Sequence, residues 1–211
     1  MDIVLFVFDD MTALDLVGPM DIMALMPGAE LKIVGQNKGP VRAGKGKRSI
    51  GVVADYALAE VDSGDVLIVP GGMGTRALIH DEAVTGWIAK IHKTTTWTTS
   101  VCTGALLLAA AGVLKDVPAT THWAAMELLE KLGAVPTSKR VVEDGKIITA
   151  AGVSSGIDMA LTLAARIKGE DVARAIQLMI EYDPEPPFNS GNAGTVSPEI
   201  RKLAVELVSA R

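Results

Sequence analysis

The chain of 211 residues contains a single cysteine, Cys102, and only three histidines. One cysteine cannot form an internal disulfide, so nothing in the sequence indicates an oxidising compartment, and a cytoplasmic location is expected. His80, His92 and His122 do not stand at the spacings typical of zinc sites, so no metal site is predicted. No apolar run has the length of a membrane span, and the N-terminus lacks the basic segment of a secretion signal. Neither membrane insertion nor secretion by this route is expected.

Positive charge is also scarce, since the formal net charge is −5. Nucleic-acid binding generally needs a cationic surface, so a nucleic-acid partner is not expected. The densest basic run, Lys45, Lys47 and Arg48, is diluted by Gly44 and Gly46 and is typical of a solvated hairpin tip. With 49% hydrophobic and 21% charged residues, the composition is that of a globular protein, and the length predicts one domain over residues 1–211.

Short runs rich in valine, isoleucine and leucine alternate with longer amphipathic segments. This alternation predicts an α/β fold with a mostly parallel sheet and crossover helices on both faces. The strands are expected at 3–8, 31–34, 66–69 and 95–101, with antiparallel hairpins within 39–55 and over 140–150. Helices are expected at 13–26, 82–92, 104–111, 123–132, 157–167 and 171–182, and a short one after an irregular loop at 183–198. Ser154 or Ser155 is expected to cap the helix at 157–167.

The segment from Ser100 to Ala105 places Cys102 where a buried strand turns abruptly into a helix. Such a turn lifts the side chain out of the carboxyl edge of the sheet, where open α/β sheets usually bind ligands. The start of the helix offers unpaired N–H groups that stabilise a thiolate, so Cys102 is expected to be an ionised nucleophile near neutral pH. The alternative is a small buried hydrophobic residue, which is a common fate of a free cysteine.

Pro70, Gly71 and Gly72 end the neighbouring strand. The N–H groups of Gly71 and Gly72, with that of Thr103, could form an anion hole that stabilises charge on a substrate attacked by sulfur. The alternative is an ordinary strand-to-helix turn that needs glycine for its dihedral angles.

Asp15 stands between two leucines near the start of the first helix. It could cap that helix. If it faces the Cys102 pocket instead, a neighbouring thiolate and desolvation would both raise its pKa and make it a proton donor. His122, within Thr120–Trp123, is a possible partner of Cys102, but the structural interpretation, a hydrogen bond to a loop backbone, is favoured. Trp123 is expected in the core.

Five segments together resemble the ThiJ/PfpI superfamily and, within it, the isonitrile hydratases: Val69–Gly72, Ser100–Ala105, Ala119–Trp123, Ser154–Asp158 and Tyr182–Phe188. The resemblance covers almost the entire chain. It implies a flavodoxin-like three-layer sandwich, related to the glutamine amidotransferases, and a homodimer. It also implies that no cofactor is needed.

The resemblance assigns roles residue by residue. Cys102 is the nucleophile, Asp15 the acid, Thr103 the donor of an N–H and a hydroxyl, and Gly72 the donor of another N–H. Most of the superfamily has glutamate at the place of Asp15, whereas the isonitrile hydratases have aspartate. Peptidase-like members have histidine at the place of Thr103, so proteolysis is disfavoured. The implied reaction adds water to an isonitrile, the small-molecule partner, through a thioimidate on Cys102.

Three other functions stay open. The same segments resemble the sensor domains of AraC-type regulators, but this chain ends at Arg211 without a helix-turn-helix region. A glyoxalase or deglycase acting on reactive carbonyls would keep Cys102 but usually has glutamate rather than Asp15. Redox sensing by an exposed thiolate is compatible with catalysis.

Overall fold

A computed structural model describes residues 1–209, apart from the side chains of Lys47 and Ser209. The side chain of Lys47 and the last two residues of the expected 1–211 domain therefore lie outside the described part, while the backbone at Gly46–Arg48 forms the expected hairpin tip. The chain forms two compact units, Met1–Ile180 and Glu181–Arg211, which are described separately. A single domain over the whole chain stays a prediction.

The larger unit is built on a seven-stranded sheet with the order β10-β11-β7-β6-β1-β2-β5. Neighbouring strands are parallel except for the hairpin of β10 and β11 at one edge. Two small sheets lie outside it, an antiparallel β3–β4 hairpin and a parallel β8–β9 pair. The strands are β1 Asp2–Phe6, β2 Glu30–Gly35, β3 Gly39–Ala43, β4 Ile50–Ala54, β5 Tyr56–Ala57, β6 Val66–Val69, β7 Trp97–Val101, β8 Pro118–Ala119, β9 Val135–Pro136, β10 Val141–Asp144 and β11 Ile147–Ala150.

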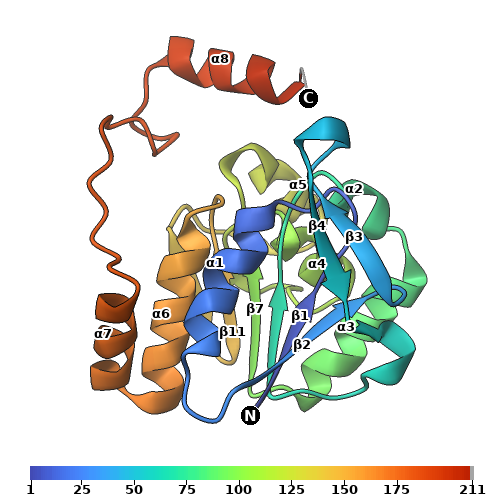
Figure 1. Cartoon of the computed structure of the whole chain (residues 1–211). Coiled ribbons are helices and arrows are strands. Elements are labelled where there is room, and N and C mark those ends of the chain that lie inside the picture. Colours follow the sequence, from blue (N-terminus) through green and yellow to red (C-terminus); the bar gives the residue numbers. More distant parts are fainter. Residues whose placement is uncertain (210–211) are drawn as a thin grey trace. The chain divides into compact units, whose positions relative to one another are not determined.

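Helices cover both faces of the sheet (Figure 1). Helices α1 and α6 pack against each other on one face, with α7 against α6, while α3 and α4 pack together on the other. The helices are α1 Ala13–Ala24, α2 Thr75–Leu78, α3 Glu82–Thr94, α4 Gly104–Ala110, α5 Met126–Lys131, α6 Ser155–Lys168, α7 Glu170–Met179 and α8 Pro198–Ser209, with short 3-10 turns at Gly46–Arg48, Leu58–Glu60 and Trp123–Ala125. This is the three-layer α/β architecture that the sequence predicts.

The central strands are apolar along their whole length because helices cover them on both sides. All four residues of β6 are buried, as are the last four of β1. Since β6 and β7 are parallel neighbours, the residues that follow them meet at one edge of the sheet. That edge carries the glycine turn after β6 and Cys102 after β7.

Most expected elements are present, including both hairpins. The expected cap of α6 is wrong: the side chain of Ser154 forms no cap hydrogen bond, and the Ser155 hydroxyl donates to the Gly152 carbonyl instead. Helix α7 ends at Met179 rather than at 182. The two-residue strands β5, β8 and β9 and the one-turn helix α2 are not predicted from the sequence, because elements this short carry no periodic pattern.

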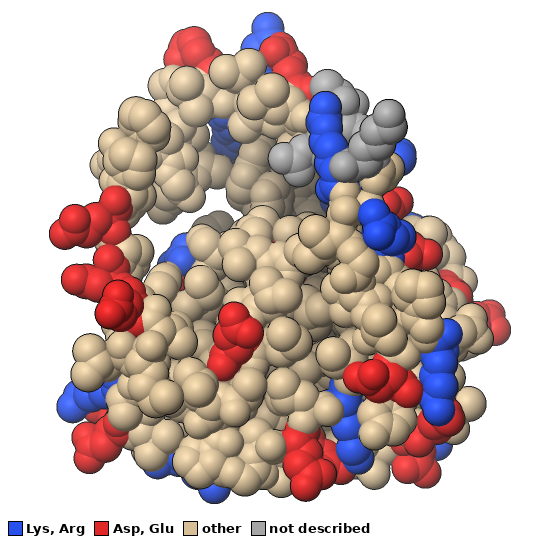
Figure 2. Space-filling model, in the orientation of Figure 1, with Lys and Arg blue, Asp and Glu red and all other residues tan. Residues whose placement is uncertain are grey.

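Charged side chains of both signs are interspersed on the face that Figure 2 shows, with no continuous basic patch. Within residues 1–209, no helix combines the length and the apolar character that a bilayer span requires. In the smaller unit, α8 follows an irregular proline- and glycine-rich segment, as expected.

Candidate active site

Cys102 follows β7 directly and has a φ angle of 54°, in the left-handed region that non-glycine residues rarely adopt. Its backbone N–H donates to the carbonyls of Ala150 (3.1 Å), the last residue of β11, and Ala151 (2.8 Å), which follows it. Its own carbonyl accepts a hydrogen bond from the Thr121 hydroxyl at 2.8 Å. The backbone is therefore held from both sides in a strained conformation, as in a nucleophile elbow. The predicted strand, turn and helix around Cys102 are confirmed.

Asp15 lies in the first turn of α1 with no exposed surface. Its Oδ2 atom accepts a hydrogen bond from the Gly71 N–H at 2.9 Å, so the carboxyl group turns away from its own helix and toward the glycine turn. The alternative in which Asp15 caps α1 is therefore wrong. Within residues 1–209, the buried Oδ1 atom has no hydrogen-bond partner.

The Asp15 carboxyl and the Cys102 thiol are close enough to alter each other's pKa. Burial raises the pKa of Asp15 from its ordinary 3.8 to about 7, against smaller lowering effects of the Gly71 N–H and the Cys102 side chain. Burial, and then the charge of Asp15, raises the pKa of Cys102 to about 12, although the N–H groups of Thr103 and Val153 oppose this. Only 5% of Cys102 is exposed, so desolvation is the dominant effect.

The expectation of an independent Cys102 thiolate near neutral pH is therefore wrong. The backbone amides at the start of α4 do lower the pKa, but burial and the neighbouring carboxylate raise it more. Two interacting groups titrate as a pair, and this pair loses its first proton near pH 7. Above that pH, one proton remains for Asp15 and Cys102 to share.

The glycine turn does not provide the expected anion hole in this structure. The Gly71 N–H binds Asp15, and the Gly72 N–H donates to the Thr103 hydroxyl oxygen at 2.8 Å. That hydroxyl in turn donates to the Gly72 carbonyl at 3.1 Å. Both glycine amides are thus occupied by protein side chains, which they fix beside Cys102. The amides that face the sulfur belong to Thr103 and Val153 instead.

Close backbone approach explains why glycine stands at position 71. A Cβ atom on Gly71 would lie 2.4 Å from the Thr103 nitrogen and 2.9 Å from Asp15 Oδ2. Atoms cannot approach this closely, so any side chain there would push the glycine turn away from both residues. The turn therefore serves the geometry of the Asp15–Cys102 pair.

His122 has the structural role that the sequence analysis favours. Its Nδ1 atom accepts a hydrogen bond from the Ala124 N–H at 3.3 Å, and its pKa is lowered by burial and by the charge of Arg76. It is therefore neutral at neutral pH. Trp123 is half-buried, with its ring centroid 5.4 Å from that of His122, so its expected place in the core is wrong.

Sequence reasoning missed three residues of this site. Val153 contributes an N–H to the Cys102 sulfur, and Thr121 holds the Cys102 carbonyl. Arg76 is half-buried, and its Nη1 donates to the Gly72 carbonyl at 3.0 Å. The sequence points to the neighbouring residues Ser154 and His122 but not to Val153 or Thr121 themselves, because a backbone amide or a single threonine forms no pattern.

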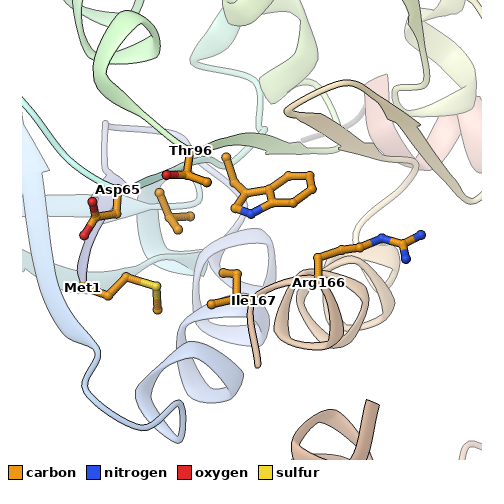
Figure 3. A pocket seen from close by; sticks show the side chains of 7 residues that line it. Met1, Asp65, Thr96, Arg166 and Ile167 are labelled. Atoms are coloured by element: carbon orange, nitrogen blue, oxygen red, sulfur yellow. The ribbon is translucent and has the colours of Figure 1, made fainter. Parts of the chain in front are cut away.

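A separate cavity of about 380 Å³ lies at the opposite edge of the sheet (Figure 3). Three lining residues mark the amino ends of central strands: Met1 precedes β1, Val66 begins β6 and Trp97 begins β7. The carboxyl ends of these strands lie on the side of Cys102, so the cavity is at the other edge of the sheet. Asp65, Thr96, Arg166 and Ile167 complete its lining. It contains neither Asp15 nor Cys102 and is not part of this site.

The profile of the DJ-1/PfpI family matches residues 1–166. The isonitrile hydratase of Pseudomonas putida is 40% identical over 208 residues, which cover 97% of this chain and 90% of that protein. A transcriptional regulator of the helix-turn-helix type from Pseudomonas aeruginosa, CdhR, is 31% identical over 143 residues, or 67% of this chain and only 41% of the regulator.

Among solved structures, a ThiJ/PfpI family protein from Pseudomonas syringae matches with a TM-score of 0.93 and 37% identity, covering 99% of this chain and 86% of that one. The DJ-1beta structure of Drosophila melanogaster matches with a TM-score of 0.76 and 20% identity, covering 85% of this chain and 97% of that one. The latter likeness concerns the fold alone.

Proposed function

Because the chain belongs to the DJ-1/PfpI family, we propose that it is an isonitrile hydratase, a lyase that adds water to an isonitrile and releases an N-substituted formamide. The observation that carries the proposal is the pairing of a fully buried Asp15 with Cys102 at a strained strand-to-helix turn. A nucleophile and a proton donor with coupled titration are what this reaction requires. The similarity to the Pseudomonas putida hydratase supports it over nearly the full length of both chains.

In the first step the shared proton lies on Asp15 and the sulfur is the nucleophile. A bond forms between the Cys102 sulfur and the terminal carbon of the isonitrile, and the electron pair of that carbon takes the proton from Asp15. The products are a thioimidate on Cys102 and an Asp15 carboxylate. The Thr103 and Val153 amides stabilise the sulfur while it carries charge.

In the second step water adds across the carbon–nitrogen double bond, its oxygen to carbon and one proton to nitrogen. The carbon–sulfur bond then breaks, and the remaining hydroxyl proton passes to the Asp15 carboxylate. The formamide leaves, and the starting pair is restored. The unpartnered Oδ1 atom of Asp15 suits an oxygen that delivers and then receives this proton.

Gly71, Gly72 and Thr103 act in this proposal by positioning. The Gly71 N–H orients the carboxyl group of Asp15, and the Gly72–Thr103 hydrogen bonds fix the residue after the nucleophile. No step requires a cofactor, because sulfur and carboxyl move all the electrons and protons. We also expect a cytoplasmic protein, as the single cysteine indicates, and a homodimer, as the family resemblance implies.

Two alternatives have less support. A sensor domain of a transcriptional regulator fits the partial match to CdhR, but this chain spans only 41% of that protein. A glyoxalase-like enzyme would use a glutamate in place of Asp15. Neither alternative uses a buried aspartate paired with the cysteine.

The test is formamide production from a simple aryl isonitrile, followed by chromatography. We expect Cys102→Ala to abolish turnover and Asp15→Asn to lower it by about 10² to 10⁴-fold. The matched control is Asp21→Asn, an exposed aspartate on the same helix, which should leave the rate unchanged. Intact-mass measurement during turnover should show an adduct of one isonitrile on the wild type and none on Cys102→Ala. Formamide production by Cys102→Ala at the wild-type rate excludes the covalent mechanism.

A further inference from the structure

Arg76 is a half-buried cation beside the Asp15–Cys102 pair that the proposed reaction does not use. Two chains of contacts place it there. In the first, Arg76 Nη1 lies 3.0 Å from the Gly72 carbonyl oxygen, which lies 3.1 Å from the hydroxyl of Thr103, the residue next to Cys102. The Arg76 guanidinium group and the Thr103 hydroxyl thus bind the same carbonyl oxygen, that of Gly72.

The second chain of contacts runs through His122. The charge of Arg76 is close enough to affect this ring, and the ring lies against Gly152, where an added Cβ would be 3.2 Å from His122 Cδ2. Gly152 is followed by Val153, whose N–H faces the Cys102 sulfur. Arg76 therefore belongs to the half-buried rim around the nucleophile, which we define as Arg76, His122, Gly152 and Val153.

The positive charge of Arg76 is not neutralised by the protein. Among residues 1–209 it forms no ion pair, although acidic Asp9 and Asp10 lie on the neighbouring loop. Its two protein hydrogen bonds, to the Gly72 carbonyl and the Thr75 hydroxyl, both use Nη1. Within the described residues, Nε and Nη2 bind no acceptor, and these two nitrogens form the edge that a carboxylate can bind with two parallel hydrogen bonds.

The other titratable groups at this rim do not compensate that charge. His122 is neutral at neutral pH because burial and Arg76 lower its pKa. Above about pH 7 the Asp15–Cys102 pair carries one negative charge, but the N–H groups of Gly71, Thr103 and Val153 bind this pair, and among residues 1–209 Asp15 forms no ion pair with Arg76. The rim therefore carries one positive charge next to a reaction whose simplest substrates are neutral.

We propose that Arg76 binds a carboxylate on the substrate, so that the preferred substrates are isonitriles bearing a carboxylate a few bonds from the isonitrile group. This inference rests on the proposed function, since it specifies the substrate class of the same site. A half-buried guanidinium group with a free bidentate edge selects a planar anion over a neutral group of the same shape. Methyl esters of the same isonitriles are the neutral counterparts.

The kinetic test compares isocyanoacetate and 4-isocyanobenzoate with their methyl esters, because the two acids differ in the reach of the carboxylate. For at least one length, we expect kcat/KM of the acid to exceed that of its ester about tenfold in the wild type. In Arg76→Gln, which keeps a donor for the Gly72 carbonyl but removes the charge, this ratio should fall to about one. Arg76→Lys should retain part of the preference, and Arg174→Gln, an exposed arginine on α7, is the control that should retain all of it.

A binding test separates this inference from the proposed function. Calorimetry with 4-formamidobenzoate and its methyl ester needs no turnover. Tighter binding of the acid to the wild type, lost in Arg76→Gln and weakened by added salt, supports the inference even if no isonitrile is hydrated. Equal binding and turnover of acid and ester in the wild type, or an acid preference that persists in Arg76→Gln, overturns it. Failure of the proposed function is recognised separately, because then neither the two acids nor their methyl esters yield a formamide.

Discussion

The two ends of strand β7 differ in how completely their polar groups are hydrogen-bonded. At the amino end, the Thr98 hydroxyl bonds to His92 Nδ1 at 2.8 Å and to the Thr95 hydroxyl at 2.7 Å, and the Thr95 hydroxyl donates to the His92 carbonyl. Lys146 adds hydrogen bonds to the carbonyls of His92 and Thr95 at the end of α3. The Thr95 and Thr98 hydroxyls, His92 Nδ1 and the Lys146 ammonium group all have hydrogen-bond partners, so the cluster fastens α3 to the sheet.

The carboxyl end of β7 leaves groups strained or unpartnered. Cys102 has a left-handed backbone, and within residues 1–209 the buried atoms Asp15 Oδ1 and Ser100 Oγ have no hydrogen-bond partner. Such features cost free energy and persist where a function requires them. One strand is thus stabilised at one end and prepared for chemistry at the other.

Gly71→Ala should have the largest effect, because the added Cβ would overlap the Thr103 nitrogen at the carboxyl end. We expect a loss of about 3 kcal/mol or more in unfolding free energy and loss of turnover, measured by denaturant titration and formamide assay. The matched control is Gly86→Ala on an exposed face of α3, where a Cβ meets nothing within 4 Å. That variant should be stabilised by up to about 1 kcal/mol. Equal effects at the two glycines would contradict the close approach.

Asp15→Asn should increase stability while it lowers activity. The folded pKa of Asp15 is raised from 3.8 to about 7, so the folded state holds a proton that the unfolded chain releases. Wild-type stability therefore falls as pH rises from about 4 to about 7, and asparagine avoids this loss. The stability gain of the variant should be about 2 to 3 kcal/mol larger at pH 8 than at pH 5, by thermal or urea unfolding. A gain that does not vary with pH would show that Asp15 titrates normally.

The pH profile of turnover should reflect the shared proton. Below pH about 7, the pair holds two protons and the sulfur is not nucleophilic, so kcat/KM should fall about tenfold per pH unit. Above that pH the pair holds one proton, and the rate should level off. In Asp15→Asn the acidic limb should move well above pH 7, because Cys102 must then lose its own proton and burial raises its pKa. An acidic limb that stays near pH 7 in Asp15→Asn assigns it to another group.

Thr98→Val should have the smallest effect. It keeps the shape of the side chain but leaves His92 and Thr95 without their shared partner. We expect a loss of about 1 to 2 kcal/mol in unfolding free energy with kcat/KM unchanged, measured on the same samples. A selective loss of activity at unchanged stability would mean that the two ends of β7 are coupled.

The sequence predicted the position of Cys102 well because that position is local. A β-branched strand, a glycine and an alanine- and leucine-rich helix specify the turn within ten residues. The fold class followed from the alternation of apolar and amphipathic segments in the same way. The orientation of Asp15 could not be predicted, because spacing near a helix start fits both a cap and a buried acid.

The anion hole and the free thiolate were predicted wrongly for one physical reason. Sequence shows which groups can donate a hydrogen bond but not which acceptors lie within hydrogen-bond distance of them in the folded chain. Here Asp15 and Thr103 occupy the amides of Gly71 and Gly72, and burial of the sulfur outweighs the helix start. These outcomes depend on distances between segments far apart in the chain.

The contacts that hold Cys102 determine when activity appears during folding. Its amide and sulfur are fixed by the segment from Ala150 to Val153, and its carbonyl by Thr121, so two distant segments must both be in place around one residue. Contacts of such large sequence separation form late, because closing long loops is entropically costly. Catalytic competence should therefore return after the secondary structure during refolding, so that activity reports the native packing of the whole sheet.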